Sequence, residues 1–120
     1  MNKGELKIRY AERKDVGLIL KFIKAIADYE KLLNEVVATE DILNEWVFDK
    51  KRAEVLIGEV DGTPVGFALF FHNFSTFKGR SGLYLEDLFV YPEYRGNGYG
   101  KALFTKLAQI AVERKCGRYE

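Results

Sequence analysis

The fold of this chain is decided by one stretch, Leu83-Tyr-Leu-Glu-Asp-Leu-Phe-Val-Tyr-Pro-Glu-Tyr-Arg-Gly-Asn-Gly-Tyr-Gly100. It begins as an apolar strand, continues into a glycine-rich turn and opens an amphipathic helix. Glycine carries no Cβ, so the backbone of such a turn can approach a ligand closely. The unpaired amides and the dipole of a first helical turn favour an anion. The stretch therefore predicts a phosphate cradle, with Arg95 as a cation at its mouth.

The spacing of the glycines narrows the kind of phosphate site. Gly96, Gly98 and Gly100 depart from the dinucleotide pattern Gly-x-Gly-x-x-Gly, and Lys101 lacks the Ser or Thr neighbour of a P-loop. The pattern that fits is Arg-x-x-Gly-x-Gly, beginning at Arg95. It resembles the acetyl-CoA-binding motif of the GNAT acetyltransferase superfamily. The alternative is a surface turn that happens to be rich in glycine.

Composition describes an ordinary globular protein with a single domain over residues 1–120. The net charge is +1, so neither a nucleic acid nor an anionic membrane is expected as a partner. No apolar run is long enough to span a membrane, and the first residues lack the apolar core of a signal peptide. Cys116 is the single cysteine, and no spacing of His, Cys and acidic residues suggests a metal site. We therefore expect a cytoplasmic location.

Hydrophobic periodicity predicts the element order β-α-α-β-β-β-α. A second, short helix should begin at Thr39 as its N-cap, and Asp61-Gly62-Thr63 is a hairpin signal. The expected strands cover residues 6–10, 53–60, 64–71 and 82–90, and the expected helices cover 14–30, 39–46 and the segment after Gly98 to about 115. The fold class is α/β (α+β), with a GNAT-like mixed, mostly antiparallel sheet flanked by helices.

The final residues follow a helix that should cross over to another strand. Gly117-Arg118-Tyr119-Glu120 have the character of the first residues of that strand. We therefore expect a domain that is truncated at its C-terminus, with its C-terminal strands absent, or a sheet that another molecule completes. A sheet edge left exposed in this way is prone to pairing.

Two acids, Glu86 and Asp87, interrupt the apolar strand before the cradle. Side chains alternate between the two faces of a sheet, so at least one acid points inward unless a bulge intervenes. A buried carboxylate needs a partner, and one alternative is a structural pair with an Arg, a Lys or a backbone amide. Acetyl transfer to an amine favours another interpretation, because a carboxylate can bind the ammonium group and accept its proton. Glu86 is our candidate for that role.

A closer resemblance extends over nearly the whole chain. Ala27-Asp-Tyr-Glu30, Val65-Gly-Phe-Ala68, and the Leu83–Val90 block followed by Tyr94-Arg-Gly-Asn-Gly-Tyr-Gly100 are similar to the diamine (spermidine/spermine) N-acetyltransferase family. The resemblance implies direct transfer of an acetyl group from acetyl-CoA to a primary amine of a small polyamine or diamine-like substrate. It also implies a homodimer.

The resemblance further implies a role for each residue that matches the family motifs. Glu86 would be the catalytic residue that meets the amine, and Tyr29 and Glu30 would line the acceptor site. The residues that would bind the coenzyme are Leu88, Phe89 and Val90 for the pantetheine arm, and Arg95, Gly96, Asn97, Gly98, Tyr99, Gly100 and Lys101 for the pyrophosphate. The family's tyrosine that protonates the departing thiolate has no equivalent in Tyr99 or Tyr119.

The same residues are compatible with two other functions. A non-catalytic acyl-CoA-binding fragment would bind CoA without acetylating any amine. An acetyltransferase for protein N-termini or lysines would need an open groove for a peptide. A closed acidic pocket around Tyr29, Glu30 and Glu86 would argue against that last function.

Overall fold

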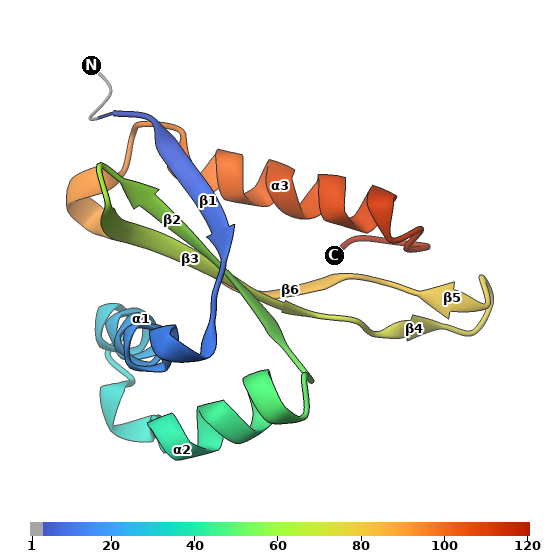
Figure 1. Cartoon of the computed structure of the whole chain (residues 1–120), viewed down its shortest axis with the longest axis horizontal. Helices are drawn as coiled ribbons and strands as arrows, with labels where there is room; N and C mark the ends of the chain where they lie inside the picture. Colours follow the sequence, from blue (N-terminus) through green and yellow to red (C-terminus); the bar gives the residue numbers. More distant parts are fainter. Residues whose placement is uncertain (1–3) are drawn as a thin grey trace.

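The computed structural model describes residues 4–120. The bounds of the helices and strands are β1 Leu6–Tyr10, α1 Val16–Tyr29, α2 Glu40–Leu43, β2 Glu54–Val60, β3 Thr63–Phe71, β4 Phe74–Ser75, β5 Arg80–Ser81, β6 Tyr84–Val90 and α3 Tyr99–Glu113. A four-stranded sheet has the order β1-β2-β3-β6, and each neighbouring pair is antiparallel. Helix α3 lies over one face of this sheet, and α1 and α2 lie over the other (Figure 1). No helix within residues 4–120 is long and apolar enough to cross a membrane.

The predicted fold class and the order of the main elements are confirmed. Val60 pairs with Thr63, and Asp61 and Gly62 form a two-residue turn with φ values of 51° and 78°. Thr39 caps α2 as predicted, because its hydroxyl accepts a hydrogen bond from the Ile42 amide at 3.2 Å. The hairpin and the cap are therefore both set by local sequence.

Two short segments depart from the expectation. The second helix changes character after Leu43 and continues as a π-helix over Asn44–Asp49. The segment between the strands expected at 64–71 and 82–90 contains a small second sheet, in which Phe74 pairs with Ser81. In Figure 1 this β4–β5 arm projects from the body of the molecule. Strands of two residues are too short to show any hydrophobic period.

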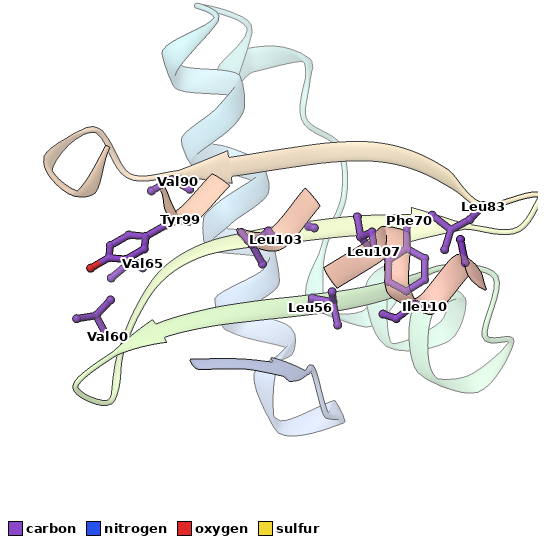
Figure 2. Packing of buried hydrophobic residues seen from close by; sticks show 12 residues of the cluster. Leu56, Val60, Val65, Phe70, Leu83, Val90, Tyr99, Leu103, Leu107 and Ile110 are labelled. Atoms are coloured by element: carbon purple, nitrogen blue, oxygen red, sulfur yellow. The ribbon is translucent and has the colours of Figure 1, made fainter. Parts of the chain in front are cut away.

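Apolar side chains form one cluster on each face of the sheet. On one face Phe22 of α1 stacks on Phe67 of β3, with ring centroids 4.9 Å apart, and fixes α1 against the sheet. On the other face the cluster joins α3 to the sheet (Figure 2), and Leu6 and Ile8 of β1 pack against it. Its labelled members are Leu56, Val60, Val65, Phe70, Leu83, Val90, Tyr99, Leu103, Leu107 and Ile110. Burial of both clusters is the main source of stability.

The last residues extend the sheet beside β6. The Leu83 amide donates to the Arg118 carbonyl at 2.9 Å, and the Glu120 amide donates to the Leu83 carbonyl at 3.0 Å. The bridge between Leu83 and Tyr119 is parallel. A parallel bridge beside β6 is the pairing expected at the start of a strand that follows a crossover helix, although residues 117–120 form no strand of their own. The expected truncation stays a prediction.

Candidate active site

A β-bulge in β6 determines where the two acids lie. Leu69 pairs with Asp87, whereas Phe70 pairs with Leu85, so Glu86 is an extra residue in β6. The extra residue breaks the alternation of side chains along the strand. As a result, Glu86 and Asp87 line the same pocket instead of opposite faces of the sheet.

This acidic pocket has a volume of about 330 Å³ and lies at the C-terminal end of α1. The helix ends in a Schellman-type turn, in which the Leu32 amide donates to the Ala27 carbonyl at 2.7 Å. Tyr29 and Glu30 stand at this turn and line the pocket. The full lining is Ile26, Tyr29, Glu30, Glu86, Asp87, Leu88, Phe89 and Arg95. The structure thus brings together every residue predicted for the acceptor site.

The electrostatics of the acidic pocket favour a cation. Within residues 4–120, the carboxylates of Glu30, Glu86 and Asp87 form no ion pair. Burial raises the pKa of Asp87 above its ordinary value, and the charges of Glu86 and Glu30 raise it further. The C-terminal end of the α1 dipole adds partial negative charge. A carboxylate in such surroundings is suited to exchange a proton with a bound ligand.

A second cleft, the glycine-loop cleft, adjoins the acidic pocket, because Leu88, Phe89 and Arg95 line both. Its volume is about 400 Å³ and its lining is Leu88, Phe89, Val90, Tyr94, Arg95, Gly96, Gly98, Tyr99 and Gly100. The structure therefore places the predicted coenzyme residues together, except for Asn97 and Lys101. Lys101 lines a separate groove between β1 and α3. Asn97 donates from Nδ2 to the Tyr94 carbonyl at 2.9 Å and so braces the loop from within.

The backbone of the glycine loop leaves its amides available to a ligand. Gly96 and Gly98 both have φ of 82°, a left-handed conformation that other residues adopt only at a cost. The Ala102 amide donates to the Gly98 carbonyl at 3.0 Å and closes the first turn of α3. In the part of the chain that the structure describes, the amides of residues 96–101 donate to no protein acceptor. Together with the positive end of the α3 dipole, they suit a phosphate group.

The edge of β6 continues this cleft. The Tyr91 amide donates to the Val65 carbonyl at 2.9 Å, so the backbone of Tyr91 faces β3. The direction of backbone hydrogen bonds alternates along a strand, so Leu88 and Val90 direct theirs away from β3. An extended ligand that contains amide groups can pair with this edge as another strand would.

Two predicted residues lie differently from the expectation. Arg95 does not project from the mouth of the loop: its Nε donates to the Val90 carbonyl at 2.9 Å, and its guanidinium lies 4.8 Å from the ring centroid of Tyr29. Tyr99 has its ring buried in the core, and its hydroxyl donates to the Gly4 carbonyl at 2.6 Å. Only the backbone of Tyr99 is therefore in a position to bind an anion. Neither side-chain conformation is encoded in the spacing of a motif.

Comparison with known proteins identifies the domain. The acetyltransferase (GNAT) family matches residues 22–120. The chain belongs to this family. Thialysine N-epsilon-acetyltransferase of Bos taurus is 37% identical over 120 residues, covering 92% of this chain and 70% of the bovine protein. Spermidine/spermine N(1)-acetyltransferase-like protein 1 of Homo sapiens is 34% identical, covering 92% of this chain and 17% of the human protein.

A solved structure supports the same assignment. The ribosomal-protein-alanine N-acetyltransferase from Brucella melitensis biovar Abortus 2308 superposes with a TM-score of 0.80 at 25% identity, covering 96% of this chain and 78% of that one. The GNAT resemblance and the relationship to diamine acetyltransferases are therefore confirmed. The protein is an acetyltransferase.

Asp87 is the residue of this acetyltransferase that the predicted site left out. It lies beside Glu86 in sequence, but strict alternation would have turned it to the other face of β6. Only the register shift between β3 and β6 brings it into the acidic pocket. Tyr119, by contrast, lines neither pocket, and its hydroxyl donates to the Phe104 carbonyl at 3.0 Å.

Proposed function

We propose that this acetyltransferase transfers an acetyl group from acetyl-CoA directly to a primary amine of a small polyamine or diamine-like molecule. One observation carries the proposal. A pocket whose carboxylates form no ion pair within residues 4–120 adjoins a cleft whose loop amides donate to no acceptor in that range, and the two share Leu88, Phe89 and Arg95. A polyanionic thioester and a cationic amine would therefore meet at β6. The relatives named for thialysine and for spermidine/spermine support a small amine as the acceptor.

The coenzyme side of the proposal uses the backbone. The amides of residues 96–101 would hold the diphosphate, and the edge of β6 at Leu88 and Val90 would pair with the amide groups of the pantetheine arm. Phe89 and Leu88 line both clefts, so the thioester end of the arm would lie where the acidic pocket begins. No side chain of the loop is required for this recognition, which is why glycines suffice.

The amine side uses the carboxylates. A primary ammonium group has a pKa of about 10.4, so it must lose a proton before its nitrogen can attack. Glu86 would bind the ammonium, and Asp87, with its raised pKa, is suited to accept that proton directly or through a water. The nitrogen then bonds to the carbonyl carbon of the thioester and the carbon–sulfur bond breaks. The nitrogen loses its second proton as the amide forms, and this proton balances the one that the departing thiolate takes up. Tyr29 and Glu30 would hold the remainder of the substrate.

The test combines isothermal titration of acetyl-CoA with a thiol-release assay on spermidine, putrescine and thialysine. We expect binding and turnover. Glu86→Gln should lower kcat/KM for the amine by roughly ten- to a hundredfold, because it removes a charge-assisted hydrogen bond to the ammonium. Affinity for acetyl-CoA should stay near that of the unmodified protein, because the glycine-loop cleft is untouched. Glu113→Gln, an exposed acid at the far end of α3, is the matched control and should behave as the unmodified protein.

Other outcomes of these assays decide between the alternatives. Binding of acetyl-CoA without turnover of any amine would favour a non-catalytic acyl-CoA-binding module, and turnover unaffected by Glu86→Gln would remove the role assigned to Glu86. Acetylation of peptides but not of diamines would favour a protein acetyltransferase. The homodimer and the cytoplasmic location stay predictions, and light scattering that gives a monomer at high concentration would contradict the dimer.

A further inference from the structure

The Arg95 side chain lies where the two clefts adjoin, because it lines both. Its Nε donates to the Val90 carbonyl at 2.9 Å, and its guanidinium lies 4.8 Å from the ring centroid of Tyr29 and 5.4 Å from that of Phe89. Within residues 4–120 it forms no ion pair with a carboxylate, and the residue is exposed. Contacts of this kind are individually weak and easily exchanged.

The position of Arg95 conflicts with the binding of the coenzyme. Val90 directs its carbonyl to the open edge of β6, which is the edge proposed for the pantetheine arm. An amide group that pairs with this edge needs the carbonyl that Arg95 occupies. A diphosphate on the neighbouring loop also offers the guanidinium a stronger partner than an aromatic ring. Coenzyme binding therefore favours a different position of the Arg95 side chain.

The same position conflicts with the binding of the amine. Arg95 lines the acidic pocket and places a fixed positive charge against the ring of Tyr29. A cationic substrate would be repelled by this charge and would compete with it for the aromatic face. Withdrawal of the guanidinium would leave both the ring and the carboxylates to the substrate.

We propose that Arg95 is a latch that closes the acidic pocket in the free protein and opens it when the coenzyme binds. The inference rests on the proposed function, because it needs both ligands to bind where that function places them. It implies that the amine binds well only after acetyl-CoA. Arg95 is thus a positioning residue that couples the two ligands, since each ligand favours the same withdrawn side chain.

The test measures spermidine affinity by calorimetry, with the free protein and with the protein saturated with CoA, which carries no acetyl group to transfer. We expect spermidine to bind the saturated protein roughly tenfold more tightly or better, because the latch must otherwise be displaced. Arg95→Lys keeps a positive charge for the diphosphate but loses the Nε bond and the planar stacking group. In this variant, spermidine should bind the CoA-saturated protein less than about threefold more tightly than the free protein, because binding to the free protein is strengthened. Arg52→Lys, which lines neither cleft, should keep the ratio of the unmodified protein.

A spectroscopic signal follows the latch directly. The Nε–H resonance of Arg95 in labelled protein, identified by its loss in Arg95→Lys, should shift when CoA is added. Spermidine alone should cause such a shift only at the higher concentrations that are needed to displace the latch. Equal spermidine affinity with and without CoA, or an unchanged ratio in Arg95→Lys, would overturn the latch. If Arg95→Lys no longer binds CoA, its spermidine affinity in the free state decides: tighter binding supports the latch and unchanged binding refutes it. Failure of the unmodified protein to bind CoA or to acetylate any amine would instead refute the proposed function.

Discussion

Replacing Gly98 with alanine is the sharpest test of the phosphate cradle. Gly98 has φ of 82°, and a Cβ added there would meet no atom within 4 Å. The cost is therefore conformational rather than steric, and an alanine held in this region is disfavoured by about 1–2 kcal/mol. The loop can relieve that strain only by rotating the peptides whose amides are proposed to bind the diphosphate.

The expected loss of affinity follows from this geometry. Turning one amide away from a charged phosphate costs about 1.5–3 kcal/mol, which corresponds to a rise in the Kd for acetyl-CoA of roughly ten- to a hundredfold. Gly79→Ala is the matched control, because Gly79 also has positive φ, of 66°, and also has no atom within 4 Å of an added Cβ. It lies in the arm between β4 and β5, so it should lose similar stability without any loss of affinity.

Chemical denaturation measures the stability of both variants, and isothermal titration measures the Kd for acetyl-CoA. The reasoning predicts that the two variants lose comparable stability while only Gly98→Ala binds the coenzyme more weakly. If Gly98→Ala were destabilised like Gly79→Ala but retained the affinity of the unmodified protein, the loop amides would not form the phosphate site. The coenzyme would then have to be held by other groups of the cleft.

Two carboxylates with opposite pKa shifts give the remaining predictions. Burial and neighbouring charges raise the pKa of Asp87, so its ionised form destabilises the fold at neutral pH. Asp87→Asn should be more stable at pH 7 by less than about 1 kcal/mol, should lose that advantage as pH falls through the raised pKa, and should acetylate amines more slowly in the thiol-release assay. The buried Asp15 accepts from Arg9 Nη1 at 2.8 Å and Nη2 at 3.0 Å, and these bonds lower its pKa. Asp15→Asn should lower the free energy of unfolding by about 2–4 kcal/mol at pH 7, as measured by urea denaturation. The difference between the two proteins should shrink below about pH 4, because the unmodified carboxylate becomes protonated as pH falls toward its lowered pKa. An equal cost at pH 7 and pH 3 would contradict the assignment.

Much of the architecture can be predicted from the sequence because it depends on the conformational preferences of single residues and short segments. Asp61-Gly62 can adopt positive φ at both turn positions, and Thr39 can cap a helix with its hydroxyl, whatever the rest of the chain does. Pro92 ends β6 for a similar reason, because it has no amide to donate. The glycine loop falls where its motif predicts, between that strand and α3.

The parts that escaped prediction depend on tertiary contacts. Regular alternation of side chains along β6 would place Glu86 and Asp87 on opposite faces of the sheet. They line the same pocket because of the register shift between β6 and β3, which the sequence of β6 does not indicate. The position of the Arg95 side chain is set by Tyr29 and Val90, residues that its own motif does not contain. Motif matching therefore finds Leu88, Phe89 and Arg95, which line both clefts, but it misses the bulge that adds Asp87 and the conformation of the Arg95 side chain.

The bulge in β6 also fixes how many residues this strand must contain for its leucines to face α3. Leu83 and Leu85 pack against α3 only because the extra residue at position 86 resets the alternation before Leu88. A deletion of one residue there would turn both leucines out of the core, whereas an exchange of side chain at Glu86 or Asp87 leaves the coenzyme edge in register. A library that seeks a new acceptor amine must therefore keep the same number of residues between Leu85 and Leu88, whichever side chains it varies around the acidic pocket.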